Sequence, residues 1–493
     1  MTKLSKLNIN EIERNGQWND IDPEITGIET NSTRVEKGNI FFAKAGDTKN
    51  SHGVLFSNQA IERGASLVIT DPEGFKFALD KDLKPTIPFL LVRNLESTFD
   101  YLCQIFYPDK PKFVMGVTGT NGKTSVVNFS QQLIEKKNNS CVTIGTLGVG
   151  GVLSLRTDNT TPDQSFIAKI LHMAKSKGAD YGFLEVSSHA IVQRRINSVA
   201  FKVFCFTNLS QDHLDYHKSM ETYFKAKSSI LDILRLDTTI IVNIDDEYGK
   251  IFFTEAKNKG FKTKTIGFSD KAEVKLRVTQ GSPDIQFIEI MKGEFSYGFQ
   301  THLIGEFQAL NLGMALLTCE EFGFQFEDLV ASCNSLKPVP GRLEFVGKTK
   351  KGASVYIDFA HTPNALKHLL ETLRELAKGK LLLVFGAGGE RDKDKRKPMG
   401  AIACKYCDLV YVTDDNPRHE DAKSIRENII GSCPSAIEIE DRAEAIATAI
   451  QQARLDDIVV IAGKGHEDVQ IVRDNHFPFS DFEQASIAIE LVE

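Results

Sequence analysis

Short apolar runs alternate along the chain with polar or glycine-rich segments and with stretches of helical periodicity. Runs of strand length lie at Ile40–Ala43, Ser66–Thr70, Phe113–Val117, Tyr181–Val186, Lys202–Phe206, Thr239–Val242, Leu381–Phe385, Leu409–Thr413 and Ile458–Ala462. The segment Ser125–Lys136 has the pattern of a helix, and further helical stretches separate the later strands. Strands that alternate with helices are typical of a mostly parallel sheet with helices on both faces. The pattern therefore predicts an α/β protein.

Proline-containing breaks divide this pattern into three predicted domains. Pro108 and Pro111 follow the first group of strands, and Pro338 and Pro340 form a second break, after which the strand–helix alternation restarts. A chain of 493 residues also suggests about three domains, at roughly 100–200 residues each. We predict a smaller α/β domain at residues 1–109, a central domain at residues 110–338 and a third domain at residues 339–493.

Charge and hydropathy exclude several classes of partner. The formal net charge is −7, which gives no general attraction to nucleic acid or to an anionic membrane. No apolar run reaches the length of a membrane-spanning helix, and the segment from Met1 to Asn10 lacks the apolar stretch of a signal peptide. We therefore expect a cytoplasmic protein that binds no nucleic acid and does not insert into a membrane.

A glycine-rich loop after the strand Phe113–Val117 is the strongest single sign of chemistry. It reads Gly119-Thr120-Asn121-Gly122-Lys123-Thr124 and leads into the predicted helix. Glycines let a backbone approach phosphate groups, and a helix N-terminus favours their negative charge. In such a loop Lys123 would reach the β- and γ-phosphates of a nucleotide, and the Thr124 hydroxyl would face Mg²⁺. The usual G-x-x-x-x-G-K-T pattern has glycine where this chain has Val117, so the loop is a variant.

Two polar clusters follow other strands of the central segment. Glu185-Val186-Ser187-Ser188-His189 stands at the end of a strongly apolar strand, where a carboxylate could hold a metal near phosphates. Asn208–His217 contains two histidines and two aspartates within six residues. Metal or phosphate chemistry and an ordinary polar surface turn are both compatible with this second cluster.

Three charged loops follow strands in the last third of the chain, at Gly386–Asp392, Asp415–Arg418 and Gly463–Glu467. The first lacks the third glycine of a dinucleotide-binding G-x-G-x-x-G, because Arg391 stands in its place, so a NAD site is not expected. Functional loops of parallel sheets lie at the carboxyl ends of the strands. The three loops could therefore surround a small zwitterion.

Taken in order, these segments resemble the Mur ligase family, which builds the peptide of bacterial peptidoglycan. The resemblance covers essentially the whole chain and rests on T-G-T-N-G-K-T, E-V-S-S-H, N-x-x-x-D-H-L-D-x-H, G-R-L-E at Gly341–Glu344, D-N-P-R and G-K-G-H-E. It is closest to the MurE type, which adds the third amino acid to UDP-N-acetylmuramoyl-L-alanyl-D-glutamate. The resemblance implies an ATP-dependent amide ligase that works through an acyl-phosphate, requires Mg²⁺ and adds meso-2,6-diaminopimelate. It also implies a P-loop-type sheet in the central, ATP-binding domain, a Rossmann-like C-terminal domain that binds the amino acid, and an N-terminal domain that binds the UDP-sugar.

The resemblance also assigns roles to individual residues. It implies catalytic roles for Lys123, Glu185, His213 and Lys227. It implies that Mg²⁺ is held by Thr124, Glu185, His213 and a carbamate of Lys227; without carbamylation, Lys227 would be a solvated helix lysine. ATP contacts are implied for Gly119–Thr124, Asn311, Arg342, Asp358 and His361. Contacts with the nucleotide-sugar peptide are implied for Thr33, Asn159, Thr160, Thr161, Ser187, Gln193 and Arg195.

The C-terminal loops carry the specificity that the resemblance implies. Diaminopimelate is implied to contact Arg391, Asp415, Asn416, Pro417, Arg418, Gly463 and Glu467. In this family, D-N-P-R in the loop Asp415–Arg418 is associated with diaminopimelate. Arg418 would pair with the carboxylate at the far end of the diaminopimelate side chain, which L-lysine does not have. Three alternatives stay open: the same ligase acting on L-lysine, a folylpolyglutamate synthetase-like ligase, and a P-loop ATPase acting on nucleic acid or on another partner. The expected partners are small-molecule substrates, and the chain is expected to be a monomer.

Overall fold

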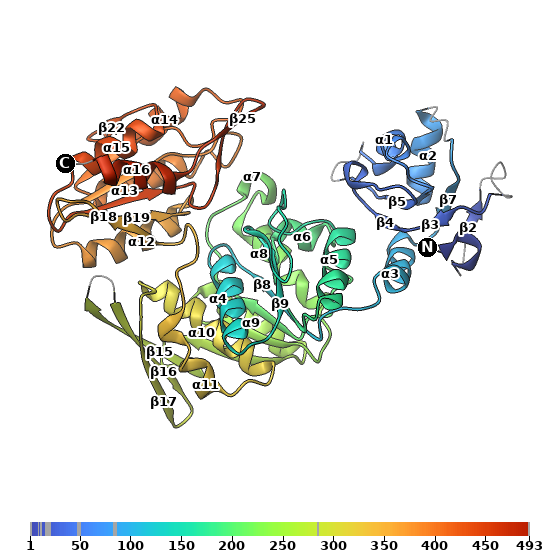
Figure 1. Cartoon of the computed structure of the whole chain (residues 1–493), viewed down its shortest axis with the longest axis horizontal. Helices are drawn as coiled ribbons and strands as arrows, with labels where there is room; N and C mark the ends of the chain where they lie inside the picture. Colours follow the sequence, from blue (N-terminus) through green and yellow to red (C-terminus); the bar gives the residue numbers. More distant parts are fainter. Residues whose placement is uncertain are drawn as a thin grey trace. The chain divides into compact units, whose positions relative to one another are not determined.

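The computed structural model of the chain describes residues 2–7, 9, 12–14, 21–46, 51–81, 86–282 and 285–491 (Figure 1). Contacts divide the chain into two compact units. The first unit comprises Met1–Val114 and Asn139–Phe201, and the second comprises Met115–Asn138 and Lys202–Glu493. Both units contain mostly parallel strands with helices between them, so the predicted α/β class is confirmed.

The first unit contains a small sheet near the N-terminus and a second group of strands. Its elements are β1 (Thr2–Lys3), β2 (Ile12–Arg14), β3 (Glu24–Ile25), β4 (Gly27–Glu29), β5 (Asn39–Ala43), α1 (Ser57–Glu62), β6 (Leu67–Thr70), α2 (Pro72–Asp80), β7 (Phe89–Val92), α3 (Leu95–Phe106), β9 (Cys141–Gly145), β10 (Gly148–Gly151), α5 (Gln164–Ser176), β11 (Tyr181–Glu185) and α6 (Ser188–Val192). The small sheet has the order β2-β7-β6-β5-β4, and only β2 is antiparallel to its neighbour. In the second group β9 pairs with β11 in parallel and with β10 in antiparallel fashion.

The second unit begins with a sheet whose parallel strands are buried on both faces. Its elements are β8 (Phe113–Thr118, mostly in this unit), α4 (Lys123–Lys136), β12 (Val203–Phe206), α7 (Leu214–His217), α8 (Met220–Ser228), β13 (Thr239–Asn243), α9 (Glu247–Asn258), β14 (Lys262–Gly267), β15 (Val274–Ser282), β16 (Ile285–Lys292), β17 (Phe295–Thr301), α10 (Glu306–Glu321) and α11 (Phe326–Val330). The strand order is β8-β12-β13-β14-β15-β16-β17, parallel up to β15 and antiparallel beyond it. Helix α10 is buried along most of its length and packs against α4.

The C-terminal part of the second unit is a doubly wound sheet. Its elements are β18 (Glu344–Lys348), β19 (Ser354–Asp358), α12 (Pro363–Leu376), β20 (Leu381–Phe385), α13 (Arg396–Tyr406), β21 (Leu409–Val412), α14 (Ala422–Ile430), β22 (Ile437–Glu438), α15 (Arg442–Gln452), β23 (Ile458–Ala462), β24 (Val469–Val472), β25 (Asn475–Pro478) and α16 (Asp481–Leu491). Successive residues of β20 point to opposite faces, as the twofold repeat of a strand requires. Leu381 and Leu383 join a core with α12, α13 and α14, whereas Leu382 and Val384 join a core with α15 and α16.

Strand order brings the charged loops of this part to one edge. The order is β18-β19-β23-β20-β21-β22, and β19, β23, β20 and β21 are parallel neighbours. Because parallel strands end on the same side, the loops that follow these four strands lie together. The same relation holds for β8 and β12, which are parallel neighbours.

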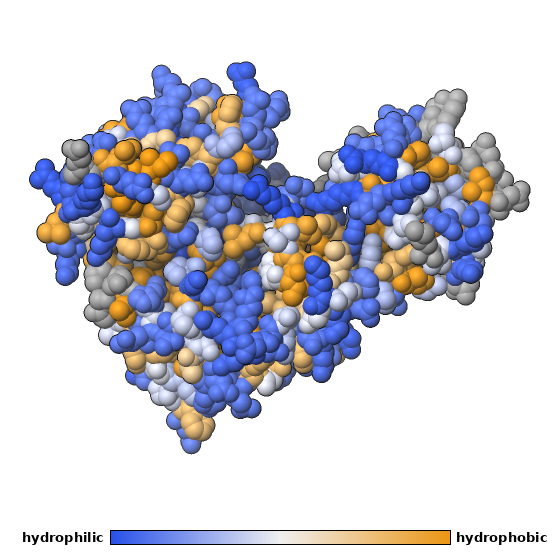
Figure 2. Space-filling view, viewed as in Figure 1, coloured by the Kyte–Doolittle hydropathy of each residue, from blue (hydrophilic) through white to orange (hydrophobic). Residues whose placement is uncertain are grey.

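Apolar side chains are concentrated in these cores. Hydrophilic residues cover most of the surface visible in Figure 2, with hydrophobic residues among them. None of the helices in the described part of the chain has the length and apolar character needed to cross a membrane.

Candidate active site

The predicted phosphate loop connects β8 to α4 and is held by the segment that follows β12. The backbone N–H of Thr120 donates to the carbonyl oxygen of Asn208 (2.9 Å), and that of Asn121 donates to the Asn208 side-chain oxygen (2.9 Å). The Lys123 ammonium folds back over the loop and donates to the carbonyl oxygens of Gly119 (2.9 Å) and Thr120 (2.8 Å). The loop is therefore already shaped, and its lysine lies along it.

Two glycines of this loop are required by its geometry. Gly119 and Gly122 have φ angles of 146° and 89°, which disfavour any residue with a Cβ. A Cβ on Gly122 would also lie 2.4 Å from the side-chain oxygen of Asn311. Val117, by contrast, lies within β8, where it is buried and opposite Cys205 of β12. The departure from the usual pattern thus falls in the strand rather than in the phosphate loop.

A cavity of about 700 Å³ opens beside the loop. It is lined by Asn121 and Gly122 from the loop and by three residues predicted to contact ATP: Asn311, Arg342 and Asp358. Pockets of roughly 300–1,000 Å³ are typical of small-molecule and cofactor sites. The structure therefore brings these predicted residues together around one space of suitable size.

Arg342 links the loop to the C-terminal part of the same unit. Its guanidinium donates to the Thr124 hydroxyl (3.3 Å) and lies 4.3 Å from the centre of the Phe359 ring. Stacking on an aromatic ring attracts a guanidinium and restricts its position, and the guanidinium stays charged. A cation is thus fixed at the N-terminal end of α4, where phosphate groups are expected.

Asp358 ends β19, His361 follows three residues later, and both have shifted pKa values. The Asp358 carboxylate accepts hydrogen bonds from the backbone N–H groups of Leu343 (2.6 Å) and Ala360 (2.7 Å). Burial raises the pKa of Asp358 to about 6, although Arg342 opposes this shift. Burial and the nearby Lys395 ammonium lower the pKa of His361 to about 4, so this imidazole is neutral at pH 7.

Lys227 is buried beside the phosphate loop and is not a solvated helix lysine. Its side chain is 1% exposed, and its Nζ donates to the Gly119 carbonyl oxygen (3.0 Å) and lies 4.7 Å from the centre of the Tyr223 ring. Lys123 donates to the same carbonyl. Burial, and then the Lys123 charge, lower the pKa of Lys227 well below its ordinary value. A neutral amine at Lys227 is therefore favoured.

The residues predicted to hold Mg²⁺ belong to both units. In the second unit, Thr124 is buried at the start of α4, and the His213 Nε2 lies 3.5 Å from the Asp212 carboxylate. In the first unit, Glu185 ends β11 and accepts hydrogen bonds from the backbone (2.8 Å) and hydroxyl (3.0 Å) of Thr146. Carboxylate and hydroxyl oxygens suit Mg²⁺, which also keeps waters and binds phosphates. No three His, Cys, Asp or Glu side chains form a metal-binding group within the described residues, so the Mg²⁺ site stays a prediction.

Most of the residues predicted to bind the nucleotide-sugar peptide form one network in the first unit. Thr161 donates to the carbonyl oxygen of Glu185 (2.8 Å), and the Arg195 guanidinium donates to the carbonyl oxygen of Thr161 (2.6 Å) and to the Gln193 side chain (2.8 Å). The backbone N–H of Ser187 donates to the Thr161 hydroxyl (3.0 Å).

The other predicted contacts in this unit lie outside that network. The Thr33 hydroxyl donates to the Asn31 side chain (2.8 Å), and Asn159 is exposed. The Thr160 hydroxyl is 3.3 Å from that of Thr146. Arg34, which follows Thr33, pairs with Asp158 (3.0 Å). The roles of these residues stay predictions.

Two arginines of the C-terminal loops flank Gly388. A Cβ on Gly388 would lie 3.1 Å from Arg418 Nη1 and 3.8 Å from Arg391 Cγ. Arg418 donates to the carbonyl oxygens of Gly389 (2.8 Å) and Asn416 (3.5 Å), and among the described residues neither arginine forms an ion pair with a carboxylate. Burial, and then the Arg391 charge, lower the pKa of Arg418, and the carboxylates of Asp415, Glu467 and Glu390 oppose that shift. Guanidiniums suit carboxylates, so the role of this pair in binding a substrate carboxylate stays a prediction.

The remaining predicted residues of this site hold the loops in shape. The Asn416 side chain donates to Glu467 (2.8 Å) and accepts from the buried Lys464 ammonium (3.0 Å), which also pairs with Glu467 (3.1 Å). Pro417 is buried between Asn416 and Arg418. Gly463 has a φ angle of 115°, and a Cβ there would lie 2.8 Å from the Asp415 carboxylate. Glu467 thus already has a cationic partner within the protein.

Comparison with known proteins places the chain in a family. Two family profiles match it: "Mur ligase middle domain" at residues 117–319 and "Mur ligase, glutamate ligase domain" at residues 341–465. A Rickettsia conorii protein named UDP-N-acetylmuramoyl-L-alanyl-D-glutamate--2,6-diaminopimelate ligase is 39% identical, over 93% of this chain and 95% of its own length. The chain belongs to the Mur ligase family. An Agrobacterium fabrum protein of the same name is 35% identical, over 95% of this chain and 94% of its own length.

Solved structures agree with this assignment. A structure titled with the same ligase name has a TM-score of 0.65 and 30% identity, and the match covers 94% of this chain and 95% of that one. A Thermotoga maritima MurF ligase in complex with ADP has a TM-score of 0.66 at 20% identity, over 94% of this chain and 97% of that one. At that identity the second match shows a shared fold and no more.

Three buried charged residues of the site are missing from the sequence-based predictions. Burial alone would raise the pKa of Asp212, but His213, His361 and Lys395 outweigh it and hold the pKa at about 2. Lys395 and Lys464 are 5% and 0% exposed. Asp212 and Lys464 lie in motifs that the sequence analysis singles out, and Lys395 follows the loop Gly386–Asp392 by three residues. Nothing in the sequence distinguishes a buried charge from a solvated one.

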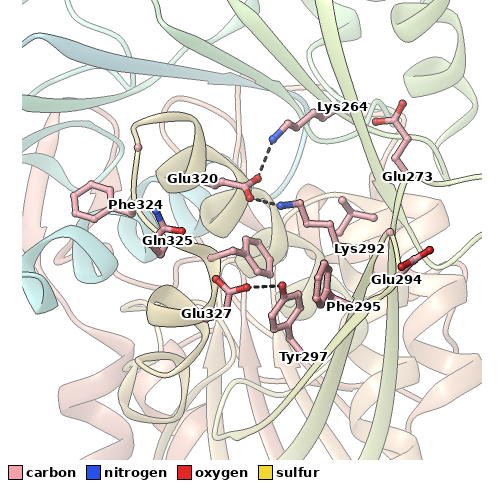
Figure 3. A pocket seen from close by; sticks show the side chains of 14 residues that line it. Lys264, Glu273, Lys292, Glu294, Phe295, Tyr297, Glu320, Phe324, Gln325 and Glu327 are labelled. Carbon is pink, nitrogen blue, oxygen red and sulfur yellow. Dashed lines mark hydrogen bonds and ion pairs between the residues drawn. The ribbon is translucent and has the colours of Figure 1, made fainter.

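A larger hollow of about 1,000 Å³ lies elsewhere in the second unit, between β14–β17 and α10–α11 (Figure 3). Its central charges already have partners within the protein, because Lys264 and Lys292 both pair with Glu320 (Figure 3). The Tyr297 hydroxyl donates to Glu327 (2.8 Å). No residue with a predicted role lines this hollow, so the smaller cavity beside the phosphate loop is the better candidate for the active site.

Proposed function

We propose that the chain uses ATP to join meso-2,6-diaminopimelate to UDP-N-acetylmuramoyl-L-alanyl-D-glutamate in peptidoglycan synthesis, as a cytoplasmic monomer. The observation that carries the choice of amino acid is the pair Arg391 and Arg418, which flank Gly388 and form no ion pair with a carboxylate in the part of the chain that the structure describes. Two guanidiniums in this arrangement suit a carboxylate on the substrate side chain. Diaminopimelate has that carboxylate, and L-lysine does not.

The chemistry starts from an unreactive carboxylate. The dipeptide carboxylate attacks the γ-phosphorus of ATP, which gives an acyl-phosphate and ADP. The charge on the transferring phosphoryl group must be neutralised, and the cations beside the phosphate loop that would do so are Lys123 and Arg342. When bound, Mg²⁺ would add further neutralisation; Thr124, Glu185, His213 and carbamylated Lys227 are the residues proposed to hold it.

The second step forms the amide bond. The amine of the incoming amino acid attacks the acyl carbon, and the tetrahedral intermediate releases inorganic phosphate. The C-terminal loops would orient this amino acid by its far end, through Arg391 and Arg418. Orientation of two reactants in this way removes much of the entropic cost of a bimolecular reaction.

An amino-acid-dependence assay tests this function. We expect phosphate release from ATP, Mg²⁺ and the UDP-muramoyl dipeptide to depend on diaminopimelate and to exceed the rate with L-lysine by at least about tenfold. Preference for L-lysine would contradict the proposed specificity. Turnover with a folate acceptor and glutamate instead of the UDP-muramoyl dipeptide would contradict the proposed ligase type.

We also propose that Lys227 carries a carbamate. Two cationic lysines on one carbonyl are unfavourable, and the lowered pKa of Lys227 supplies the neutral amine that reacts with CO₂. The neutral amine forms an N–C bond with CO₂ and releases one proton to solvent, so an uncharged group becomes an anion that could face Mg²⁺.

Labelled CO₂ provides the measurement for Lys227. A protein-bound carbamate signal should appear in the ¹³C NMR spectrum of the wild type and be absent from Lys227→Ala. Lys225→Ala is the matched control, because Lys225 is exposed on the same helix. A signal that persists in Lys227→Ala, or that no protein shows at neutral pH, would refute the carbamate.

A further inference from the structure

Lys395 is an almost completely buried lysine whose ammonium forms no hydrogen bond or ion pair with any residue that the structure describes. It directly precedes α13 and is 5% exposed. In the described part of the chain, no hydrogen bond or ion pair involves its side chain. Its neighbours in the R-D-K-D-K-R segment behave differently, because the exposed Lys393 and the buried Arg396 both pair with Glu420, at 3.4 and 3.0 Å. A structural role like that of Arg396 is therefore not open to Lys395.

Charged groups from two segments of the candidate site surround Lys395: the segment after β12 and the loop after β21. Burial lowers its pKa, and the carboxylates of Asp212, Asp415 and Asp392 oppose that shift. Asp212 belongs to the segment after β12, beside the phosphate loop, where it lies 3.9 Å from His361 Nε2. Asp415 belongs to the loop after β21, which also carries Arg418. Lys395 is thus close to carboxylates from both segments that the proposed function assigns to the two reactants.

A hydrogen bond joins the segment that carries Lys395 to the segment that follows β12. The Gln211 side chain, next to Asp212, donates to the Asp392 carboxylate (3.3 Å). Asp392 in turn accepts a hydrogen bond from the backbone N–H of Asp394 (2.9 Å), one residue before Lys395. The segment that presents Lys395 is therefore fixed to the segment that follows β12.

We propose that Lys395 is a catalytic residue whose ammonium binds the phosphoryl oxygens of the acyl-phosphate and stabilises phosphate as the leaving group. This proposal rests on the proposed ligase function. A buried cation without a partner is costly, and an anionic reaction intermediate would remove that cost. The amine nitrogen forms the new N–C bond, the C–O bond to phosphorus breaks, and its electron pair leaves on the phosphate oxygen. The nitrogen then loses its proton to solvent.

Three variants test the proposal. Lys395→Met keeps the length of the side chain without its charge, Lys395→Arg keeps a charge, and Lys393→Met is the matched control two residues away. We expect Lys395→Met to lower kcat by about 10²–10³-fold, with KM for ATP and for the amino acid changed less than about threefold. The kcat of Lys395→Arg should be at least about tenfold higher than that of Lys395→Met. The kcat of Lys393→Met should stay within about twofold of the wild-type value.

Each other outcome has a definite meaning. A kcat for Lys395→Met within about threefold of the wild type would overturn the proposal. So would a lowered melting temperature in Lys395→Met together with no recovery in Lys395→Arg, because a packing role predicts that result. If the wild type releases no phosphate with the UDP-muramoyl dipeptide and any amino acid, the proposed function itself fails, and the role of Lys395 fails with it.

Discussion

Replacing Lys123 with alanine is expected to abolish ligation and to leave the fold intact. The Lys123 ammonium lies along the phosphate loop and would act directly on the transferring phosphoryl group. Loss of one preorganised group at a developing charge typically costs about 10²–10³-fold in kcat, and the charge of a lysine makes a larger loss the expectation here. The measurement is phosphate release at saturating ATP, dipeptide and amino acid, together with the melting temperature of the variant.

Lys136→Ala is the control for this prediction. Lys136 is exposed at the other end of α4, so its removal changes the same helix and the same net charge without touching the loop. We expect wild-type turnover from it. Near-normal turnover of Lys123→Ala would remove the role assigned to the phosphate loop.

Replacing Arg418 with alanine is expected to lower kcat/KM for diaminopimelate by roughly thirtyfold to several thousandfold. The estimate takes about 2–5 kcal/mol for loss of one partner of a buried charge pair. One tenfold change corresponds to about 1.4 kcal/mol. Activity with L-lysine should fall far less, or rise, because Arg418 also repels the terminal ammonium of lysine. The measurement is kcat/KM for both amino acids with each protein.

Backbone strain does not confuse this comparison. Arg418 has a φ angle of 52°, which is equally unfavourable for arginine and alanine because both carry a Cβ. Arg473→Ala is the control: Arg473 is exposed, has a φ angle of 54°, and donates its backbone N–H to the Arg418 carbonyl. Equal losses for both amino acids in Arg418→Ala would indicate a loop defect and not a lost specificity contact.

The strands of the fold that are buried on both faces were the easiest to predict. Such strands appear in a sequence as continuous apolar runs, and the predicted bounds of β20 and β23 agree with the structure at both ends. The predicted helix at 125–136 begins two residues earlier, at Lys123, because the phosphate loop ends where the helix starts. The antiparallel strands β15, β16 and β17 are absent from the predictions, although apolar residues such as Ile288 and Ile290 alternate there with polar ones.

The sequence predicted which segments form the candidate site, but it did not predict which side chains contact one another there. Each motif gave a loop and its chemistry, but the partners of a side chain come from distant parts of the chain. Gly122 faces Asn311, and Asn416 accepts from Lys464, across 48 residues or more. The burial of Lys227 and Lys395 is likewise a property of packing, since most lysines are exposed.

The carbonyl oxygen shared by Lys123 and Lys227 couples two ligands that never need to touch. ATP would draw the Lys123 ammonium away from this oxygen, and CO₂ would convert the neutral amine of Lys227 into an anion. Each ligand therefore changes the charges that the other meets. Thermodynamic reciprocity then requires one coupling factor: whatever change CO₂ makes in nucleotide affinity, the nucleotide makes in CO₂ affinity. The dependence of the enzyme's activity on ATP concentration would in this way change with the concentration of CO₂ in the cell.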